Sequence, residues 1–96
     1  MILGAIDISK RATRLKVAEV GTGDSVRLLE RSSLVSAELS NCDRLSALLM
    51  AEIEAARDAG ADHVEVVATR SLRGTRLLRL LDRVCRASGA GGILLP

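Results

Sequence analysis

The first third of the chain contains three short segments whose hydrophobic residues favour β-strands. Ile2 to Ile8 is an almost continuous apolar run, which is typical of a strand buried on both faces. Thr13 to Val20 and Val26 to Val35 are also rich in hydrophobic residues, with looser alternation. Gly21-Thr22-Gly23-Asp24 has the composition of a hairpin turn between them. The pattern therefore predicts a meander of three antiparallel strands.

The rest of the chain alternates between helical and strand patterns. Apolar residues recur at helical spacing from about Ser40 to Ala59, and Gly60 is placed to end this helix. His63 to Thr69 is short and rich in β-branched residues, which predicts a strand. A second amphipathic helix is expected from about Arg73 to Ala87, and a fifth strand begins at Ile93 to Leu95.

The predicted order of elements is β-β-β-α-β-α-β. Strands that follow helices in this way join a sheet through parallel crossovers. A meander followed by two crossovers gives an α/β fold with a mixed five-stranded sheet and the first strand near its centre. This layout resembles that of ribonuclease H-like, or actin-like, domains. Ninety-six residues are too few for two domains with good cores, so residues 1–96 are expected to form one.

Composition limits the classes of partner. The chain has no Phe, Tyr or Trp, which disfavours the stacking used in single-stranded nucleic-acid binding. Its net charge of +2 is too small to indicate a nucleic-acid partner. Cys42 and Cys85 form no motif and are expected to be free thiols in a reducing compartment. With no apolar run long enough for a membrane span and no signal-peptide pattern, we expect a cytoplasmic protein without a membrane partner.

The strongest candidate for a functional residue is Asp7, an acid at the end of an apolar strand. A carboxylate in such a segment needs a reason to be there. It could position Mg²⁺ or a water for phosphoryl transfer. It could instead be a turn acid that accepts hydrogen bonds from the backbone of residues 9 to 11. The residues leave both interpretations open.

The turn that follows Asp7 is a second candidate, for phosphate binding. Its backbone N–H groups could hold a phosphate beside Ser9, and Lys10 and Arg11 would add positive charge. The turn has no glycine, although a close approach of backbone to phosphate usually requires one. A solvated basic turn is therefore the alternative interpretation.

The end of the fourth predicted strand is a third candidate. Ligands of open α/β sheets bind at such strand ends, and helix N-termini favour anions. Thr69 and Ser71 could donate hydrogen bonds to a phosphate, and Arg73 could pair with it. The alternative is a helix N-cap followed by surface arginines.

The second predicted helix carries a row of arginines. A polyanion could lie along this face, although a solvated helix face explains the same pattern. The row consists of Arg76, Arg79, Arg83 and Arg86. His63 is the only histidine, so the residues predict neither a zinc site nor a catalytic triad.

Several segments taken together match one family. They are Ile6–Ile8, Arg14–Leu15, Val17–Val20, Leu28–Val35, Asp58–Ala61, Ala68–Thr69 and Leu72–Arg73. This set resembles the N-terminal part of the exopolyphosphatase/guanosine-pentaphosphate phosphatase (Ppx/GppA) family. The resemblance covers nearly the whole chain and about the first third of a typical member.

The resemblance implies a phosphatase that uses Mg²⁺ and acts on polyphosphate or guanosine pentaphosphate. In the family the first loop reads D-x-G-S-N-S/T and binds phosphate. Asp7 matches this motif, whereas Ser9, Lys10 and Arg11 stand in place of its Gly, Ser and Asn. Thr69 and Arg73 match an A-T-x-x-x-R segment that lines the same cleft. Asp7 is thus the candidate ligand for the Mg²⁺ that the resemblance implies.

The same resemblance places the family's catalytic glutamate, its second phosphate motif and its second lobe beyond residue 96. It thus implies an incomplete lobe without a catalytic residue of its own and with a C-terminal lobe as partner. One alternative is a non-catalytic module of the same fold that oligomerises or binds polyanions. Another is a resolvase-like nuclease, which would need several clustered carboxylates. We also expect the apolar edge strand Ile93–Leu95 to pair with another copy in a homodimer or a higher oligomer.

Overall fold

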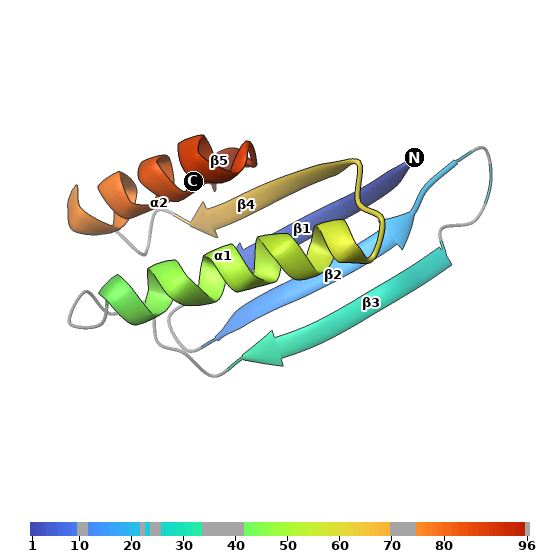
Figure 1. Cartoon of the computed structure of the whole chain (residues 1–96), viewed down its shortest axis with the longest axis horizontal. Coiled ribbons are helices and arrows are strands. Elements are labelled where there is room, and N and C mark those ends of the chain that lie inside the picture. Colours follow the sequence, from blue (N-terminus) through green and yellow to red (C-terminus); the bar gives the residue numbers. More distant parts are fainter. Residues whose placement is uncertain (10–11, 22, 24–25, 34–41, 70–74, 96) are drawn as a thin grey trace.

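The computed structural model describes residues 1–9, 12–21, 23, 26–33, 42–69 and 75–95. These residues form a sheet with two helices packed against it (Figure 1). The order of elements is the predicted one. The elements are β1 (Ile2–Ile8), β2 (Thr13–Glu19), β3 (Val26–Ser33), α1 (Cys42–Asp58), β4 (His63–Thr69), α2 (Thr75–Ser88) and β5 (Gly91–Leu95).

The five strands lie in the order β3-β2-β1-β4-β5, so β1 is the central strand. β1 and β2, and β2 and β3, are antiparallel, which confirms the predicted meander. β4 is parallel to both β1 and β5, as expected for crossover connections through helices. The predicted α/β fold, a mixed five-stranded sheet of actin-like layout, is therefore confirmed.

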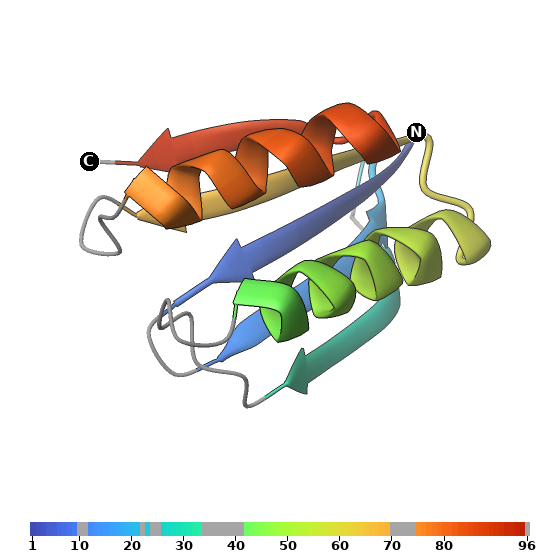
Figure 2. The same ribbon diagram turned by 60° about the vertical axis from the view of Figure 1, so that its left-hand side comes forward.

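Both helices pack on the same face of the sheet (Figure 2). In β1, Ile6 and Ile8 are fully buried on this side, whereas Ala5 and Asp7 on the other side are exposed. We call the covered side the helix face and the other the outer face. The prediction that the first strand is buried on both faces is wrong for the described part of the chain. Ala5 is small and apolar, so its outward position could not be distinguished from a buried one in the sequence.

The apolar stripe predicted for the first helix faces the sheet. Leu45, Leu49, Ile53 and Ala56 of α1 are each 0–1% exposed. A Cβ atom added to Gly4 of β1 would lie 3.0 Å from the Cβ atom of Ala56. The absence of a side chain at Gly4 therefore allows α1 to pack closely on the central strand.

The helical pattern of the sequence predicts Leu77, Leu81, Val84 and Cys85 for the buried face of α2, with Leu80 beside it. In the structure Leu80 is 1% exposed and belongs to the core, whereas Leu81 and Cys85 are half-buried, so the helix is rotated slightly from the predicted orientation. Gly60 and Gly89 have positive φ angles of 97° and 75° and end the two helices, which confirms the predicted role of Gly60. None of the described helices has the length and apolar character needed to cross a membrane.

Candidate functional site

The carboxyl ends of four strands lie at one edge of the sheet. β1, β3, β4 and β5 run in the same direction, so they all end there, while β2 begins there. Both helices also begin beside this edge (Figure 1). We call it the carboxyl edge. Ligands of open α/β sheets bind beyond such an edge, and helix N-termini there favour anions.

Asp7 lies close to the carboxyl edge, on the outer face of β1. It pairs in register with Arg14 of β2 and with Val67 of β4. Its side chain is exposed and takes part in no ion pair with any residue that the structure describes. The carboxylate is therefore accessible to a ligand. Arg14 directly opposite contributes positive charge beside it, which the sequence analysis did not consider.

The turn between β1 and β2 is closed by Ser9. The N–H of Ser9 donates to the carbonyl oxygen of Ala12 at 2.9 Å, and the Ser9 hydroxyl donates to the same oxygen at 2.8 Å. The N–H of Ala12 in turn donates to the Ser9 hydroxyl at 3.2 Å. In the described part of this turn, the closing contacts therefore come from Ser9 and not from Asp7. Lys10 and Arg11 lie outside the described residues.

The end of β4 lies directly beside the end of β1. Ile8 of β1 pairs with Ala68 of β4. The residues that follow them, Ser9 and Thr69, therefore lie next to each other at the ends of the two strands. The structure thus places the Thr69 backbone next to the turn after Asp7, as the family resemblance implied. The side chain of Thr69, and Ser71 and Arg73 altogether, lie outside the described residues.

Thr13, the last residue of the candidate loop from Ser9 to Thr13, is a polar residue of this edge that was not predicted to bind phosphate. It pairs with Ile8 of β1 and with Ser33 of β3, and it is only 1% exposed. Its hydroxyl has no hydrogen-bond partner among the described residues. The two-residue alternation of β2 places it on the helix face, opposite to Asp7. That alternation was the available signal.

The arginine row predicted on the second helix is partly described. Arg79, Arg83 and Arg86 of α2 are exposed, whereas the side chain of Arg76 lies outside the described residues. The Nε atom of Arg86 pairs with the carboxylate of Asp82 at 3.1 Å. Arg79 and Arg83 form no ion pair with a described residue.

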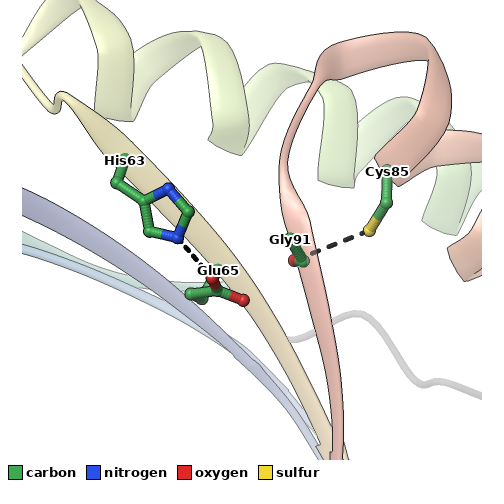
Figure 3. Close-up of polar contacts among 4 residues, drawn as sticks. All are labelled: His63, Glu65, Cys85 and Gly91. Carbon is green, nitrogen blue, oxygen red and sulfur yellow. Dashed lines mark hydrogen bonds and ion pairs between the residues drawn. The ribbon is translucent and has the colours of Figure 1, made fainter.

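A polar cluster lies at the opposite end of the sheet, where β4 and β5 begin (Figure 3). The Nε2 atom of His63 contacts a carboxylate oxygen of Glu65. The thiol of Cys85 lies 3.7 Å from the carbonyl oxygen of Gly91. Burial raises the pKa of this thiol, and the charges of Asp82 and Glu65 raise it further. Cys85 is a free thiol, as expected, and is not poised as a nucleophile.

A metal would have to be held with few protein ligands. Nowhere in the described residues do three or more His, Cys, Asp or Glu side chains come together as a metal-binding group. Mg²⁺ often takes only one or two carboxylates and completes its shell with substrate phosphates and water. The exposed Asp7 carboxylate fits that role.

The fold is shared with phosphatases of known structure. A Ppx/GppA enzyme from Aquifex aeolicus matches 99% of this chain with a TM-score of 0.83 and 22% sequence identity. An exopolyphosphatase from Cytophaga hutchinsonii matches 98% with a TM-score of 0.83 and 17% identity. The chain spans 36% and 34% of the length of these two proteins. No protein-family model and no curated protein sequence matches the chain.

RuvC, whose structure is also known in complex with a Holliday junction substrate, has a related but more distant structure. RuvC from Thermus thermophilus matches 98% of this chain with a TM-score of 0.65 and 16% identity, and the chain spans 63% of its length. The lower TM-score places the resolvase fold further from this chain than the two phosphatase structures are. At these levels of identity the likeness concerns the fold alone.

Proposed function

We propose that the chain is the N-terminal, phosphate-binding part of a Ppx/GppA-like phosphatase. Such an enzyme hydrolyses phosphoric anhydrides, polyphosphate or guanosine pentaphosphate. The observation that supports this best is the arrangement of the carboxyl edge. An exposed acid on the outer face, a turn, and two helix starts on the helix face lie along this edge, in a fold that superposes on Ppx/GppA structures with TM-scores of 0.83. The same arrangement favours an anionic ligand on physical grounds.

Each candidate residue has a role in this proposal. The Asp7 carboxylate holds Mg²⁺ together with the substrate phosphates. When bound, Mg²⁺ neutralises part of the phosphate charge. Backbone N–H groups after Asp7, with the charges of Lys10 and Arg11, bind phosphate oxygens. Thr69, Ser71 and Arg73, which follow one another at the end of β4 in the sequence, supply further hydrogen-bond donors and a positive charge.

The 96 residues bind phosphate in this proposal but do not complete the reaction. Cleavage of a phosphoric anhydride requires a base for the attacking water, in addition to a metal and a phosphate cradle. The family resemblance places the corresponding glutamate after β5, outside this chain, and a second lobe would close the site. We accordingly expect binding without turnover, in a cytoplasmic protein with reduced thiols.

The proposal is tested by calorimetric titration of the 96-residue chain with tripolyphosphate, in Mg²⁺ and in EDTA. We expect measurable binding in Mg²⁺. Asp7→Asn should weaken it about tenfold or more, because one charge-assisted metal contact is lost. In EDTA the two proteins should differ by less than about threefold, because the metal is absent.

Asp58→Asn is a matched control, because Asp58 is an exposed acid at the end of α1 remote from the carboxyl edge. Its titration should coincide with that of the wild type. Circular dichroism of all three proteins verifies the fold. A wild-type chain that takes up no tripolyphosphate in Mg²⁺, or an Asp7→Asn chain that binds equally well, would contradict the proposal.

A second candidate is a polyanion-binding module without catalysis. The observation that favours it is the exposure of Arg79 and Arg83 without ion pairs among the described residues. Under this alternative, Arg79→Ser/Arg83→Ser should weaken the binding of long-chain polyphosphate strongly in EDTA. Asp7→Asn should have little effect. The opposite pattern is expected when phosphate binds at the carboxyl edge.

A further inference from the structure

The described hydrogen-bond donors of the turn after Asp7 are directed at the chain itself. The N–H and the hydroxyl of Ser9 both donate to the carbonyl oxygen of Ala12, at 2.9 Å and 2.8 Å. The N–H of Ala12 donates to the Ser9 hydroxyl oxygen at 3.2 Å. All three donors that these two residues supply are therefore used within the turn, and a phosphate can reach one of them only by displacing an internal hydrogen bond.

The Ser9 hydroxyl takes part in two of these hydrogen bonds, in opposite senses. Its proton goes to the Ala12 carbonyl oxygen, and its oxygen accepts the Ala12 N–H. Serine hydroxyls stabilise turns through such local bonds to the backbone. The consequence at this position is specific, because backbone N–H groups are what a turn offers to an anion. The hydroxyl occupies one of them.

The hydrogen bond from Ala12 to the Ser9 hydroxyl is the longest of the three and the easiest to replace. Its length of 3.2 Å lies at the upper end of the normal range for an N–H donor. Ser9 is exposed and Ala12 is half-buried. A phosphate oxygen carries negative charge, and hydrogen bonds to charged acceptors are about twice as strong as those between neutral groups. A phosphate at this turn can therefore take the Ala12 N–H from Ser9.

We infer that the Ser9 hydroxyl competes with phosphate for the N–H of Ala12 and thereby lowers the phosphate affinity of this turn. The inference rests on the proposed phosphate site after Asp7. In the free chain the Ala12 N–H is bonded to Ser9, and in the bound chain it is bonded to a phosphate oxygen. Ser9 is then an autoinhibitory residue of the turn and not a ligand of the phosphate.

Two substitutions of Ser9 test this competition by calorimetric titration with tripolyphosphate in Mg²⁺. Ser9→Ala removes the hydroxyl and should bind tripolyphosphate about threefold to tenfold more tightly than the wild type, because no internal hydrogen bond has to be broken. Ser9→Thr keeps a hydroxyl that can form both local bonds, so its affinity should stay within about twofold of the wild-type value. A hydroxyl that contacts the phosphate directly predicts the opposite result for Ser9→Ala, a weaker affinity.

Ser88→Ala is the matched control. The Ser88 hydroxyl also donates to a backbone carbonyl, that of Val84 at 2.6 Å, but it lies at the end of α2 remote from the carboxyl edge. Its titration should coincide with that of the wild type. Circular dichroism verifies that every variant is folded.

Hydrogen exchange of the Ala12 amide, followed by NMR, reports the competition at its own atom. In the ligand-free chain, Ser9→Ala should accelerate this exchange about threefold or more, because the N–H loses its acceptor. Tripolyphosphate in Mg²⁺ should then slow the exchange in Ser9→Ala, because the N–H donates to a phosphate oxygen.

The possible outcomes separate this inference from the proposed function. A wild-type chain that binds tripolyphosphate, together with a Ser9→Ala chain that binds equally well or more weakly, would overturn the competition and leave the proposed function intact. Unchanged exchange of the Ala12 amide in Ser9→Ala would do the same, because another acceptor would then hold the N–H. Binding by Ser9→Ala alone would support the competition and contradict the affinity expected of the wild type. If neither chain binds, the proposed function fails and the inference fails with it.

Discussion

The guanidinium of Arg31 on β3 holds the carboxylate of Glu52 on α1 at two points. The Nε atom of Arg31 donates to one carboxylate oxygen at 3.0 Å, and its Nη2 atom lies 2.7 Å from the other. The Glu52 side chain is only 4% exposed, whereas that of Arg31 is 45% exposed. The hydrogen bond to Glu52 raises the pKa of Arg31. This pair connects α1 to the edge strand β3.

Removal of the Arg31 guanidinium should destabilise the fold, because it leaves the buried carboxylate of Glu52 without a partner. We expect Arg31→Met to lower the free energy of unfolding by about 2 kcal/mol, less than for a fully buried pair because water reaches Arg31. Glu52→Leu combined with Arg31→Met should recover at least about half of that loss, because no unpaired charge remains. Urea denaturation of the single and double variants measures the coupling. Strictly additive effects of the two substitutions on the free energy of unfolding would contradict an interaction between Arg31 and Glu52.

Arg27→Met is the control, because Arg27 forms an exposed ion pair with Glu30. This substitution should lower the free energy of unfolding by less than about 1 kcal/mol.

The close contact between β1 and α1 gives a second prediction. Gly4→Ala places a Cβ atom 3.0 Å from that of Ala56, so the helix must shift. We expect a loss of about 1 to 3 kcal/mol in the free energy of unfolding. Ala56→Gly in the same chain should relieve part of it. At Gly23, where an added Cβ meets nothing within 4 Å, alanine should change stability by less than about 0.5 kcal/mol. Equal losses at the two glycines would argue against the packing described.

The buried hydroxyl of Thr13 gives a third prediction. Valine has the same shape without the polar atom, which has no partner among the described residues. Thr13→Val should therefore raise the free energy of unfolding by about 1 kcal/mol, measured by urea denaturation. Thr13→Ser keeps the hydroxyl and loses a methyl group, so it should destabilise the fold. If valine destabilises the fold instead, the Thr13 hydroxyl is hydrogen-bonded in the folded chain.

The thiol of Cys85 gives a prediction on pH. Burial, and then the charges of Asp82 and Glu65, raise its pKa above the ordinary value of 9.0. The folded chain therefore holds the thiol proton more tightly than the unfolded chain does. The resulting stability is fully present below about pH 9 and is lost as pH rises through the raised pKa.

Urea denaturation at a series of pH values from 8 upward measures this dependence in a Cys42→Ser chain. Cys85→Ala in the same background is the control and should show a flatter profile. Alkylation of Cys85 at neutral pH should also be several-fold slower in the folded chain than in urea, because the thiolate is the reactive form. Equal rates of alkylation would contradict the raised pKa.

The candidate site was predictable in part. The strand patterns and the parallel crossovers of the sequence place Asp7 at the end of the first strand and Thr69 at the end of the fourth. The structure shows that these two strand ends lie side by side. The role of Ser9 in closing the turn was not predictable. The ion-pairing potential of Arg14 opposite Asp7 also required the hairpin register. Both depend on which residue faces which across strands, and a one-residue change of register would alter every pair.

The sequence by itself determined where the elements lie and in what order they follow. Residues 2 to 8 and 63 to 69 form strands with the predicted bounds, because a short apolar or β-branched run between turn residues favours that geometry locally. Only the tertiary structure decided that both helices cover the same face of the sheet. That choice left Ala5, Lys16 and Glu65 on the open side and buried Glu52 against Arg31. The period of a strand or helix is a property of the local backbone, whereas the side that becomes covered depends on segments far away in the sequence.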